Sequence, residues 1–167
     1  MVRVALGVEP DHPAFTEVRD EFLARYEARM TTGTAVFEAM RPELDALNAR
    51  HLPWGIVTNK AQRFTTPLVK ALGLDREAAT VVSGDTTPHA KPHPAPLLEA
   101  ARQLGLPPEQ CVYVGDDLRD VQAGRAAGMG TVAASWGYLG AGEPIASWGA
   151  DHVIDFPEQL LKLPWMA

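Results

Sequence analysis

Short apolar stretches that alternate with helical segments from residue 52 onward are the feature that most limits what this 167-residue chain can fold into. The stretches that read as strands are residues 54–57, 80–82, 111–114, 131–134 and 152–154. Helical segments at 66–72, 95–104 and 118–127 lie between them, and each is followed directly by a glycine. Strands that are apolar at nearly every position are covered on both faces, which is typical of parallel sheets. The pattern therefore predicts a doubly wound α/β fold.

The residues before this alternating region have a different pattern. Apolar side chains recur there at steps of three and four, as on one face of a helix: Phe15, Val18, Phe22, Tyr26 and Met30. Asp11 and Pro13 are expected to mark the start of that helix. Residues 31–34 break it, and further helices are expected at 41–50 and at 157–162. We assign residues 1–33 to a small helical lobe and residues 34–167 to the α/β core.

The composition excludes several classes of partner. Fifteen Lys and Arg against twenty-one Asp and Glu give a formal net charge of −6, which argues against nucleic acid or an anionic membrane. No apolar run approaches the roughly 20 residues that span a bilayer. The single cysteine, Cys111, cannot form an intramolecular disulfide and is expected to be buried at the start of a strand. We therefore expect a cytoplasmic protein.

Polar residues follow two of the predicted strands, and a third group lies in the loop before residue 95. These residues are Thr58 and Asn59, then Lys91, and then Asp116, Asp117 and Asp120. In doubly wound folds ligands bind at the carboxyl ends of the strands. Closely spaced carboxylates favour a hard cation such as Mg²⁺. A hydroxyl, an ammonium group and a metal-binding carboxylate together describe a phosphate site.

Each residue taken alone also has a structural interpretation. Thr58 can cap the next helix, and Lys91 can be a solvated surface charge. Asp117 can be the N-cap of the helix at 118–127, and Asp120 can complement the dipole of its first turn. The order and the spacing of the residues favour the phosphate site.

Three stretches resemble motifs of a known family. Val57-Thr58-Asn59-Lys60, Ala90-Lys91-Pro92-His93-Pro94 and Val114-Gly115-Asp116-Asp117-Leu118-Arg119-Asp120 are similar to the second, third and fourth motifs of the haloacid dehalogenase superfamily of phosphatases. The likeness is greatest to the phosphoglycolate phosphatase branch. The tail at residues 148–155 also resembles that branch, so that the resemblance covers most of the chain.

The resemblance implies a role for each site residue. Thr58 and Asn59 would donate hydrogen bonds to the transferring phosphoryl group, and Lys91 would neutralise its charge. Asp116 would be a direct Mg²⁺ ligand. Asp120 would support the metal shell or the Lys91 ammonium, and Asp117 would be an outer-shell or capping residue. Residues 1–33 would be part of the helical cap that selects the substrate.

The first motif of the family is absent from the sequence. That motif, Asp-x-Asp-Gly-Thr, supplies the nucleophile and the general acid and base. The chain has aspartates at 11, 20, 45, 75, 85, 116, 117, 120, 151 and 155, and no two of them lie two residues apart. We expect the chain to be an inactive truncation of a longer gene product. The alternative is a shortened, non-catalytic relative that binds phosphate or a protein.

The missing motif also removes a strand. In the superfamily this first strand lies between the strand that ends at Thr58 and the strand that ends at Asp116. Its loss would leave a gap of two strand spacings, roughly 10 Å. Strand exchange in a homodimer, a missing segment or residues 1–6 would have to fill this gap. We expect residues 1–6 to be helical.

The resemblance gives an expected activity for the complete protein. It would be a Mg²⁺-dependent phosphomonoester hydrolase that works through an aspartyl-phosphate on a small phosphorylated metabolite. The expected substrate is 2-phosphoglycolate. The alternative is a sugar phosphate such as N-acetylmuramic acid 6-phosphate. The 167 residues by themselves are expected to have negligible turnover.

Overall fold

The computed structural model describes residue 7, residues 9–139 and residues 142–166. The chain divides into two compact units, Met1–Thr34 and Ala35–Ala167, and each is described by itself. The prediction that residues 1–6 are helical lies outside the described residues. The interpretation of the first unit as part of a cap stays a prediction.

One long helix is the main element in the described part of the first unit. Helix α2 spans Phe15–Arg29, as the apolar spacing predicts, and none of its residues is fully buried. The chain enters it differently from the expectation, because the side chain of His12, rather than Asp11 or Pro13, accepts the backbone N–H of Ala14 at 3.1 Å. The helix ends where the threonine and glycine residues begin, and Gly33 has a φ of 75°.

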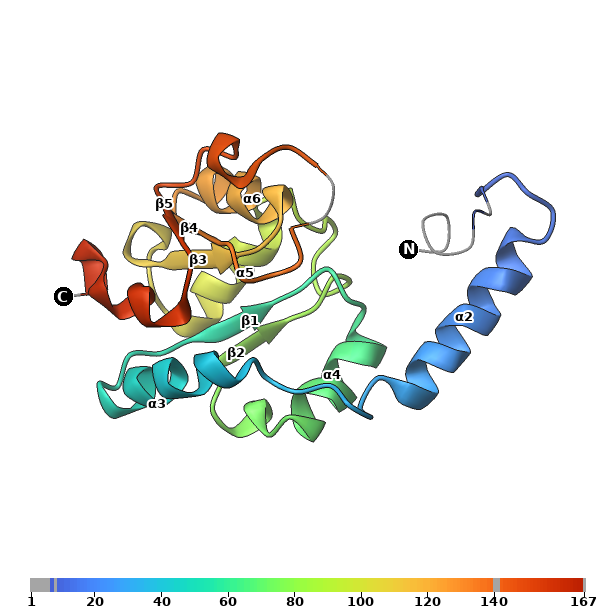
Figure 1. The fold of residues 1–167 in the computed structure, drawn as a ribbon, viewed down its shortest axis with the longest axis horizontal. Coiled ribbons are helices and arrows are strands. Elements are labelled where there is room, and N and C mark those ends of the chain that lie inside the picture. The colour runs from blue at the N-terminus through green and yellow to red at the C-terminus, as the bar shows by residue number, and fades with distance from the viewer. Residues whose placement is uncertain (1–6, 8, 140–141, 167) are drawn as a thin grey trace. The chain divides into compact units, whose positions relative to one another are not determined.

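The described part of the second unit contains five short strands with helices between them (Figure 1). The strands are β1 (Gly55–Val57), β2 (Thr80–Val82), β3 (Val112–Gly115), β4 (Gly130–Ala134) and β5 (His152–Ile154). The α-helices are α3 (Arg41–Ala49), α4 (Gln62–Ala71), α5 (Ala95–Leu104) and α6 (Leu118–Ala127). The 3-10 helices are η1 (Glu38–Met40), η2 (Leu74–Arg76), η3 (Pro108–Gln110), η4 (Ile145–Ser147), η5 (Pro157–Lys162) and η6 (Pro164–Met166).

All strand pairs are parallel, but they form two sheets. One sheet has the order β1-β2, with Ile56 opposite Val81, and the other has the order β3-β4-β5, with Val114 opposite Val132. The inner strands, β1 and β3, are not hydrogen-bonded neighbours in the described part of the chain. The parallel α/β fold predicted from the sequence is confirmed, with a break where the family's first strand was expected.

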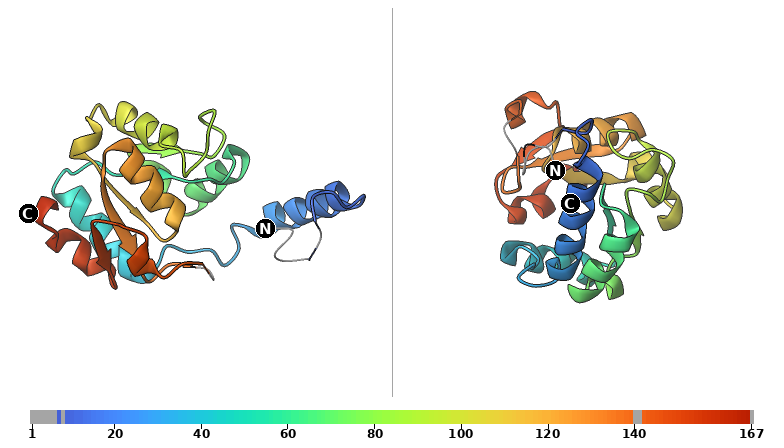
Figure 2. Two further views of the ribbon diagram at one scale, coloured as in Figure 1. Left: turned by 90° about the horizontal axis from the view of Figure 1, so that it is seen from above. Right: turned by 90° about the vertical axis from the view of Figure 1, so that its right-hand side faces the viewer.

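Helices cover both faces of the strands (Figures 1 and 2). On one face, α5 and α6 pack against Val57 and Tyr113 around the buried Leu97. On the other face, α3, α4 and η5 pack in two apolar clusters, one around Ile56 and one around Val132. This arrangement is doubly wound, because the parallel strands are covered by helices on both faces.

Two helical segments differ from the sequence prediction. Helix α4 begins at Gln62 instead of near Thr66, so that Pro67 lies inside it. Asp85 explains the earlier start, because its carboxylate accepts the Gln62 N–H at 2.8 Å. The terminal segment Pro157–Lys162 is a 3-10 helix rather than an α-helix. Helices α5 and α6 end as predicted, at glycines in the left-handed conformation.

The described helices are all too short or too polar to cross a membrane.

Candidate active site

Lys91 lies at the centre of the candidate site and contacts residues of both sheets. Its ammonium Nζ is 2.7 Å from Asp120 Oδ1, and both side chains are at least nine-tenths buried. The same nitrogen donates to the Val57 carbonyl at 2.9 Å and to the Tyr113 hydroxyl at 2.6 Å. Lys91 therefore links the carboxyl end of β1 to strand β3 and helix α6, across the break between the sheets.

These contacts occupy the whole hydrogen-bonding capacity of the Lys91 ammonium. A protonated lysine has three N–H donors, and it has three acceptors here: Val57, Tyr113 and Asp120. In this arrangement no donor is left for a phosphoryl oxygen. A contact between Lys91 and a phosphate would require one of the three acceptors to give way.

Tyr113 is a site residue that the sequence interpretation missed. Its hydroxyl donates to the Val57 carbonyl at 3.0 Å and lies 3.5 Å from Asp120 Oδ1. Burial, and then the negative charge of Asp120, raise the pKa of this hydroxyl well above its ordinary value. Tyr113 is therefore a neutral hydrogen-bonding group at any physiological pH. The available signal was a polar aromatic residue inside an otherwise aliphatic strand.

Asn59 holds the loop that carries Lys91. Its amide nitrogen donates to the Lys91 carbonyl, and its amide oxygen accepts the Lys91 N–H, both at 2.9 Å. The adjoining Thr58 donates its backbone N–H to Val82 at 2.9 Å, and its hydroxyl accepts the Lys60 N–H at 3.1 Å. The phosphoryl contacts expected of both side chains stay predictions, because both are engaged in positioning the loops.

Asp116 follows β3 directly and is held by a second loop. Its Oδ2 accepts the backbone N–H of Tyr138 at 2.7 Å. Gly137 allows this approach, because a Cβ at that position would lie 2.2 Å from the Asp116 Cβ. No local sequence pattern indicates this contact, since 22 residues separate Asp116 from Tyr138.

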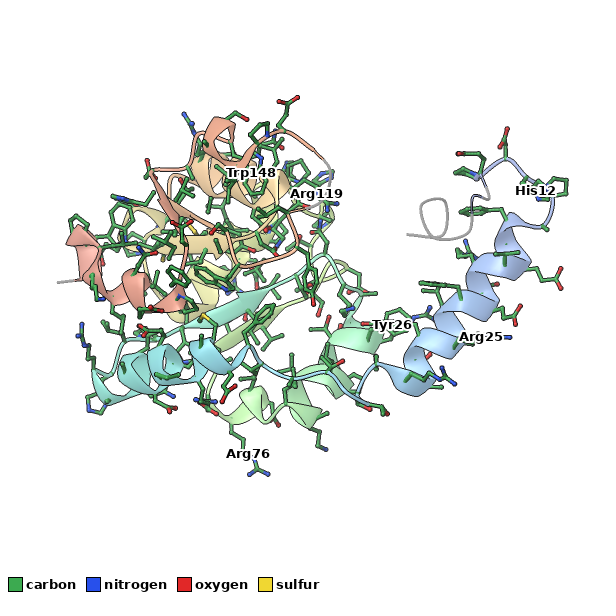
Figure 3. All side chains as sticks on the ribbon, viewed as in Figure 1. His12, Arg25, Tyr26, Arg76, Arg119 and Trp148 are labelled. Carbon is green, nitrogen blue, oxygen red and sulfur yellow. The ribbon has the colours of Figure 1, made fainter. Side chains whose placement is uncertain are left out.

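Asp117 is the N-cap of α6 and forms an ion pair with Arg119. Its Oδ1 accepts the Arg119 backbone N–H at 2.9 Å, and its Oδ2 lies 2.6 Å from the guanidinium group. This side-chain pairing lowers the pKa of Asp117 to about 2. Arg119, labelled in Figure 3, thus pairs with a carboxylate that the N-terminus of α6 also stabilises.

The three carboxylates do not converge as the spacing in the sequence suggested. Asp116, Asp117 and Asp120 each have a different partner: a backbone amide, a guanidinium group and an ammonium group. In the described part of the chain, no group of three or more acidic, His or Cys side chains could hold a metal ion. The physical reason is that closely spaced like charges separate when each has its own donor.

A Mg²⁺ site still fits the donors that remain. Proteins usually bind Mg²⁺ through one or two carboxylates together with waters and substrate phosphates. Asp116 forms none of the ion pairs found among the described residues, and one of its two oxygens accepts the Tyr138 amide. Asp116 is thus the residue that would hold the metal, with Asp120 behind it on the Lys91 ammonium.

Comparison with known proteins gives the family. The family model for haloacid dehalogenase-like hydrolases matches residues 5–134. The chain is 39% identical over 163 residues to the N-acetylmuramic acid 6-phosphate phosphatase of Pseudomonas putida, covering 98% of this chain and 73% of that relative. It is 47% identical over 141 residues to a phosphoglycolate phosphatase of Xanthomonas campestris, covering 84% of this chain but only 63% of that relative.

A solved structure agrees with these relatives. The crystal structure of a predicted phosphoglycolate phosphatase from Haemophilus somnus superposes with a TM-score of 0.83 at 28% identity. The match covers 96% of this chain and 71% of that protein. The motifs, the fold and the relatives agree, and the chain belongs to the family of haloacid dehalogenase-like hydrolases.

Proposed function

We propose that this chain is the phosphate- and metal-binding part of a Mg²⁺-dependent phosphomonoester hydrolase. The observation that carries the proposal is the convergence on Lys91, whose ammonium contacts the end of β1 and the first turn of α6. Asp116 would hold the Mg²⁺, and Lys91 would neutralise phosphoryl oxygens once one of its acceptors is displaced. The metal, when bound, would stabilise the charge that develops on the phosphoryl group.

The reaction would proceed through an aspartyl-phosphate, and the sequence places a limit on that step. None of the aspartates in the chain forms the Asp-x-Asp pair that supplies the nucleophile and the acid and base. We therefore propose that the 167 residues alone bind phosphate but have negligible turnover. Hydrolysis of a generic aryl phosphate by this chain, lost in the Asp116→Ala variant, would contradict the proposal.

The proposed substrate is 2-phosphoglycolate, and N-acetylmuramic acid 6-phosphate is the second candidate. Each is favoured by a relative, the first by the Xanthomonas phosphoglycolate phosphatase and the second by the Pseudomonas enzyme. Both are small phosphorylated metabolites, as the resemblance to the phosphatase family led us to expect. Calorimetric titration of the chain with each compound in the presence of Mg²⁺ discriminates between them. A cytoplasmic location remains part of this proposal.

A metal titration tests the role of Asp116. Binding of inorganic phosphate to the chain is expected to strengthen when Mg²⁺ is added, and the Asp116→Ala variant is expected to lose this enhancement. Asp75, an exposed aspartate in η2, provides the matched control, and Asp75→Ala should behave as the parent chain. Phosphate binding that is unaffected by Mg²⁺ would favour the non-catalytic alternative, in which the chain is a phosphate- or protein-binding module.

A glycine pair tests the positioning of Asp116. Gly137→Ala is expected to weaken the Mg²⁺ enhancement, because its Cβ would push against the Asp116 side chain. Gly142→Ala is the control, since a Cβ at Gly142 meets nothing within 4 Å. Equal effects of the two substitutions on Mg²⁺-dependent phosphate binding would show that Asp116 does not depend on this loop.

A further inference from the structure

Arg119 uses only one side of its guanidinium group to pair with Asp117. Its Nε donates to Asp117 Oδ1 at 2.9 Å, and its Nη2 donates to Asp117 Oδ2 at 2.6 Å. A guanidinium group has five N–H donors in one plane. Asp117 accepts two of them, and the other three have no acceptor in the described part of the chain. The end formed by Nη1 and Nη2 is therefore a second fork that is open to an anion.

This open fork lies beside the residues that are proposed to bind phosphate. Asp116 directly follows β3, and Asp117 is the N-cap of α6. Arg119 is in the first turn of that helix, next to Asp120, whose Oδ1 is 2.7 Å from the Lys91 ammonium. The pKa of Arg119 is raised, first by its hydrogen bond to Asp117 and, among lesser causes, by the negative charge of Asp120. The guanidinium group thus shares one electrostatic environment with the proposed phosphate site.

Lys91 and Arg119 are cations of this site that differ in what they can still bind. The Lys91 side chain is 8% exposed, and its three donors are all taken. The Arg119 side chain is 57% exposed, and it can bind a further anion without giving up Asp117. A ligand that carries a second negative group besides its phosphate should therefore place that group at Arg119.

The open fork fits a carboxylate that lies close to the phosphate. Two parallel N–H donors match the two oxygens of a carboxylate, and the charge strengthens both hydrogen bonds. A hydroxyl group would fill only one donor and leave the charge uncompensated. The partner of Arg119, Asp117, directly follows Asp116, and consecutive Cα atoms are about 3.8 Å apart. The carboxylate and the phosphate must therefore be joined by a short linker.

We propose that Arg119 recognises the carboxylate of a short phosphorylated carboxylic acid, while Lys91 and Asp116 hold its phosphate. This role rests on the proposed function, because the phosphate must be bound there for the carboxylate to reach Arg119. The role also separates the two candidate substrates. In 2-phosphoglycolate one CH₂ group joins the phosphate to the carboxylate, whereas in N-acetylmuramic acid 6-phosphate the sugar ring lies between them. Arg119 therefore favours 2-phosphoglycolate.

Calorimetric titration in the presence of Mg²⁺ tests the role of Arg119. The ligands are 2-phosphoglycolate and ethyl phosphate, which has a methyl group in place of the carboxylate. The parent chain should bind 2-phosphoglycolate about tenfold more tightly than ethyl phosphate. Arg119→Gln should abolish this preference and leave the affinity for ethyl phosphate unchanged. The variant keeps the cap of α6, because Asp117 accepts the backbone N–H of residue 119.

Arg102 provides the matched control. It forms the same fork with Glu99, through Nε at 2.8 Å and Nη2 at 2.7 Å, and its side chain is 72% exposed. Arg102 lies in the last turn of α5, before β3, whereas Arg119 follows β3, so the two lie toward opposite ends of that strand. Arg102→Gln removes the same charge and should change neither affinity. Equal effects of the two substitutions would mean that the net charge sets the preference, and they would overturn the proposal.

The side-chain nitrogen resonances of Arg119 distinguish a direct contact from a structural role. In the parent chain with Mg²⁺, 2-phosphoglycolate should shift these resonances, and ethyl phosphate should not. The resonances of Arg102 should respond to neither ligand. If Arg119→Gln abolishes the preference but the resonances of the parent chain do not respond to the carboxylate, Arg119 does not contact the ligand and the proposal is wrong.

N-acetylmuramic acid 6-phosphate tests the length of the ligand. Its carboxylate lies beyond the reach of Arg119 when its phosphate is bound at Lys91 and Asp116. Either no binding, or an affinity that Arg119→Gln leaves unchanged, agrees with the proposal. A loss in this variant as large as the loss for 2-phosphoglycolate would contradict the restriction to short acids.

Two further results separate the role of Arg119 from the proposed function. If Mg²⁺ strengthens binding of ethyl phosphate and the parent chain binds 2-phosphoglycolate no better, the role of Arg119 is wrong and the proposed function stands. If neither ester binds in the presence of Mg²⁺, the proposed function is wrong and the role of Arg119 falls with it.

Discussion

The two ends of the gap between β1 and β3 are closed in different ways. At the carboxyl end, Lys91 and Tyr113 bridge the strands through the Val57 carbonyl, and Asp120 balances the charge. At the amino end, mostly apolar side chains line a cavity. Cys111, expected to be buried, is only partly buried because it lines this cavity. The comparison shows that side chains can replace the hydrogen bonds of a missing strand at one carbonyl, but they do not replace its buried apolar surface.

The difference also extends to the strands themselves. Every residue of β3 is only partly buried, whereas four of the five residues of β4 are fully buried. The inner edges thus have the burial of edge strands, although helices cover their faces. The stability of this region should therefore depend on the polar bridge at one end more than on the packing along the gap.

We call the carboxyl end of the gap, bridged by Lys91 and Tyr113, the closed end, and the amino end, at the cavity, the open end. Removal of the Lys91 ammonium should disrupt the closed end and cause the largest loss of stability. Lys91→Met leaves the Asp120 carboxylate buried without its counter-ion and should lower the free energy of unfolding by about 3–5 kcal/mol. Denaturant unfolding measures this loss. The exposed Lys70 provides the control, because Lys70→Met should change the stability little.

A double variant distinguishes the charge from the shape of the side chain. Adding Asp120→Asn to Lys91→Met removes the uncompensated charge and should restore a large part of the lost stability. If the double variant is as unstable as Lys91→Met, Lys91 contributes mainly through packing. Both ends of the gap would then be stabilised by packing rather than by a charge pair at one of them.

Local patterns in the sequence predicted the elements of the fold. Helices α5 and α6 could be placed because Gly105 and Gly128 end them in the left-handed conformation. Pro67 misled the prediction for α4, because a proline is usually found in the first turn. Its place inside the helix depends on Asp85, which lies in a distant loop and fixes the start at Gln62.

The candidate site was predictable in its residues but not in its contacts. The motifs identified Lys91 and Asp116 because their spacing along the chain is characteristic. Tyr113 and Gly137 were missed, because their roles depend on neighbours that only the fold supplies: Val57 for the hydroxyl and Asp116 for the glycine. The separation of the three carboxylates likewise depended on partners that the spacing could not reveal.

Two valines that are register partners allow the packing of β3, at the edge of the gap, to be compared with the packing of β4, inside the sheet. Val132 is 1% exposed in β4, and its partner Val114 on β3 is only partly buried beside the gap. Val132→Ala should lower the free energy of unfolding by about 2 kcal/mol, and Val114→Ala by about 1 kcal/mol or less. Equal losses, measured by denaturant unfolding, would mean that the edge of β3 is as well packed as β4.

Substitution of Glu43 is expected to change the stability least. Glu43 also contrasts with Asp120, whose buried carboxylate has the Lys91 ammonium as its counter-ion. Glu43 lies on α3 beside the open end, its side chain has a buried oxygen without a hydrogen-bond partner among the described residues, and it forms no ion pair there. Burial, and then the charge of Glu158, raise the pKa of Glu43 above its ordinary 4.5. Because the folded state prefers the neutral carboxyl, stability is fully present below pH 4.5 and falls as the pH rises through the raised pKa.

Glu43→Gln should therefore stabilise the chain at pH 7 by about 1 kcal/mol and have little effect at about pH 4. Thermal unfolding at the two pH values measures the change, and the exposed Glu38 provides the control as Glu38→Gln. A stabilisation that is the same at both pH values would show that the charge of Glu43 is not its cause. In that case the open end would tolerate a buried carboxylate without the counter-ion that Asp120 requires at the closed end.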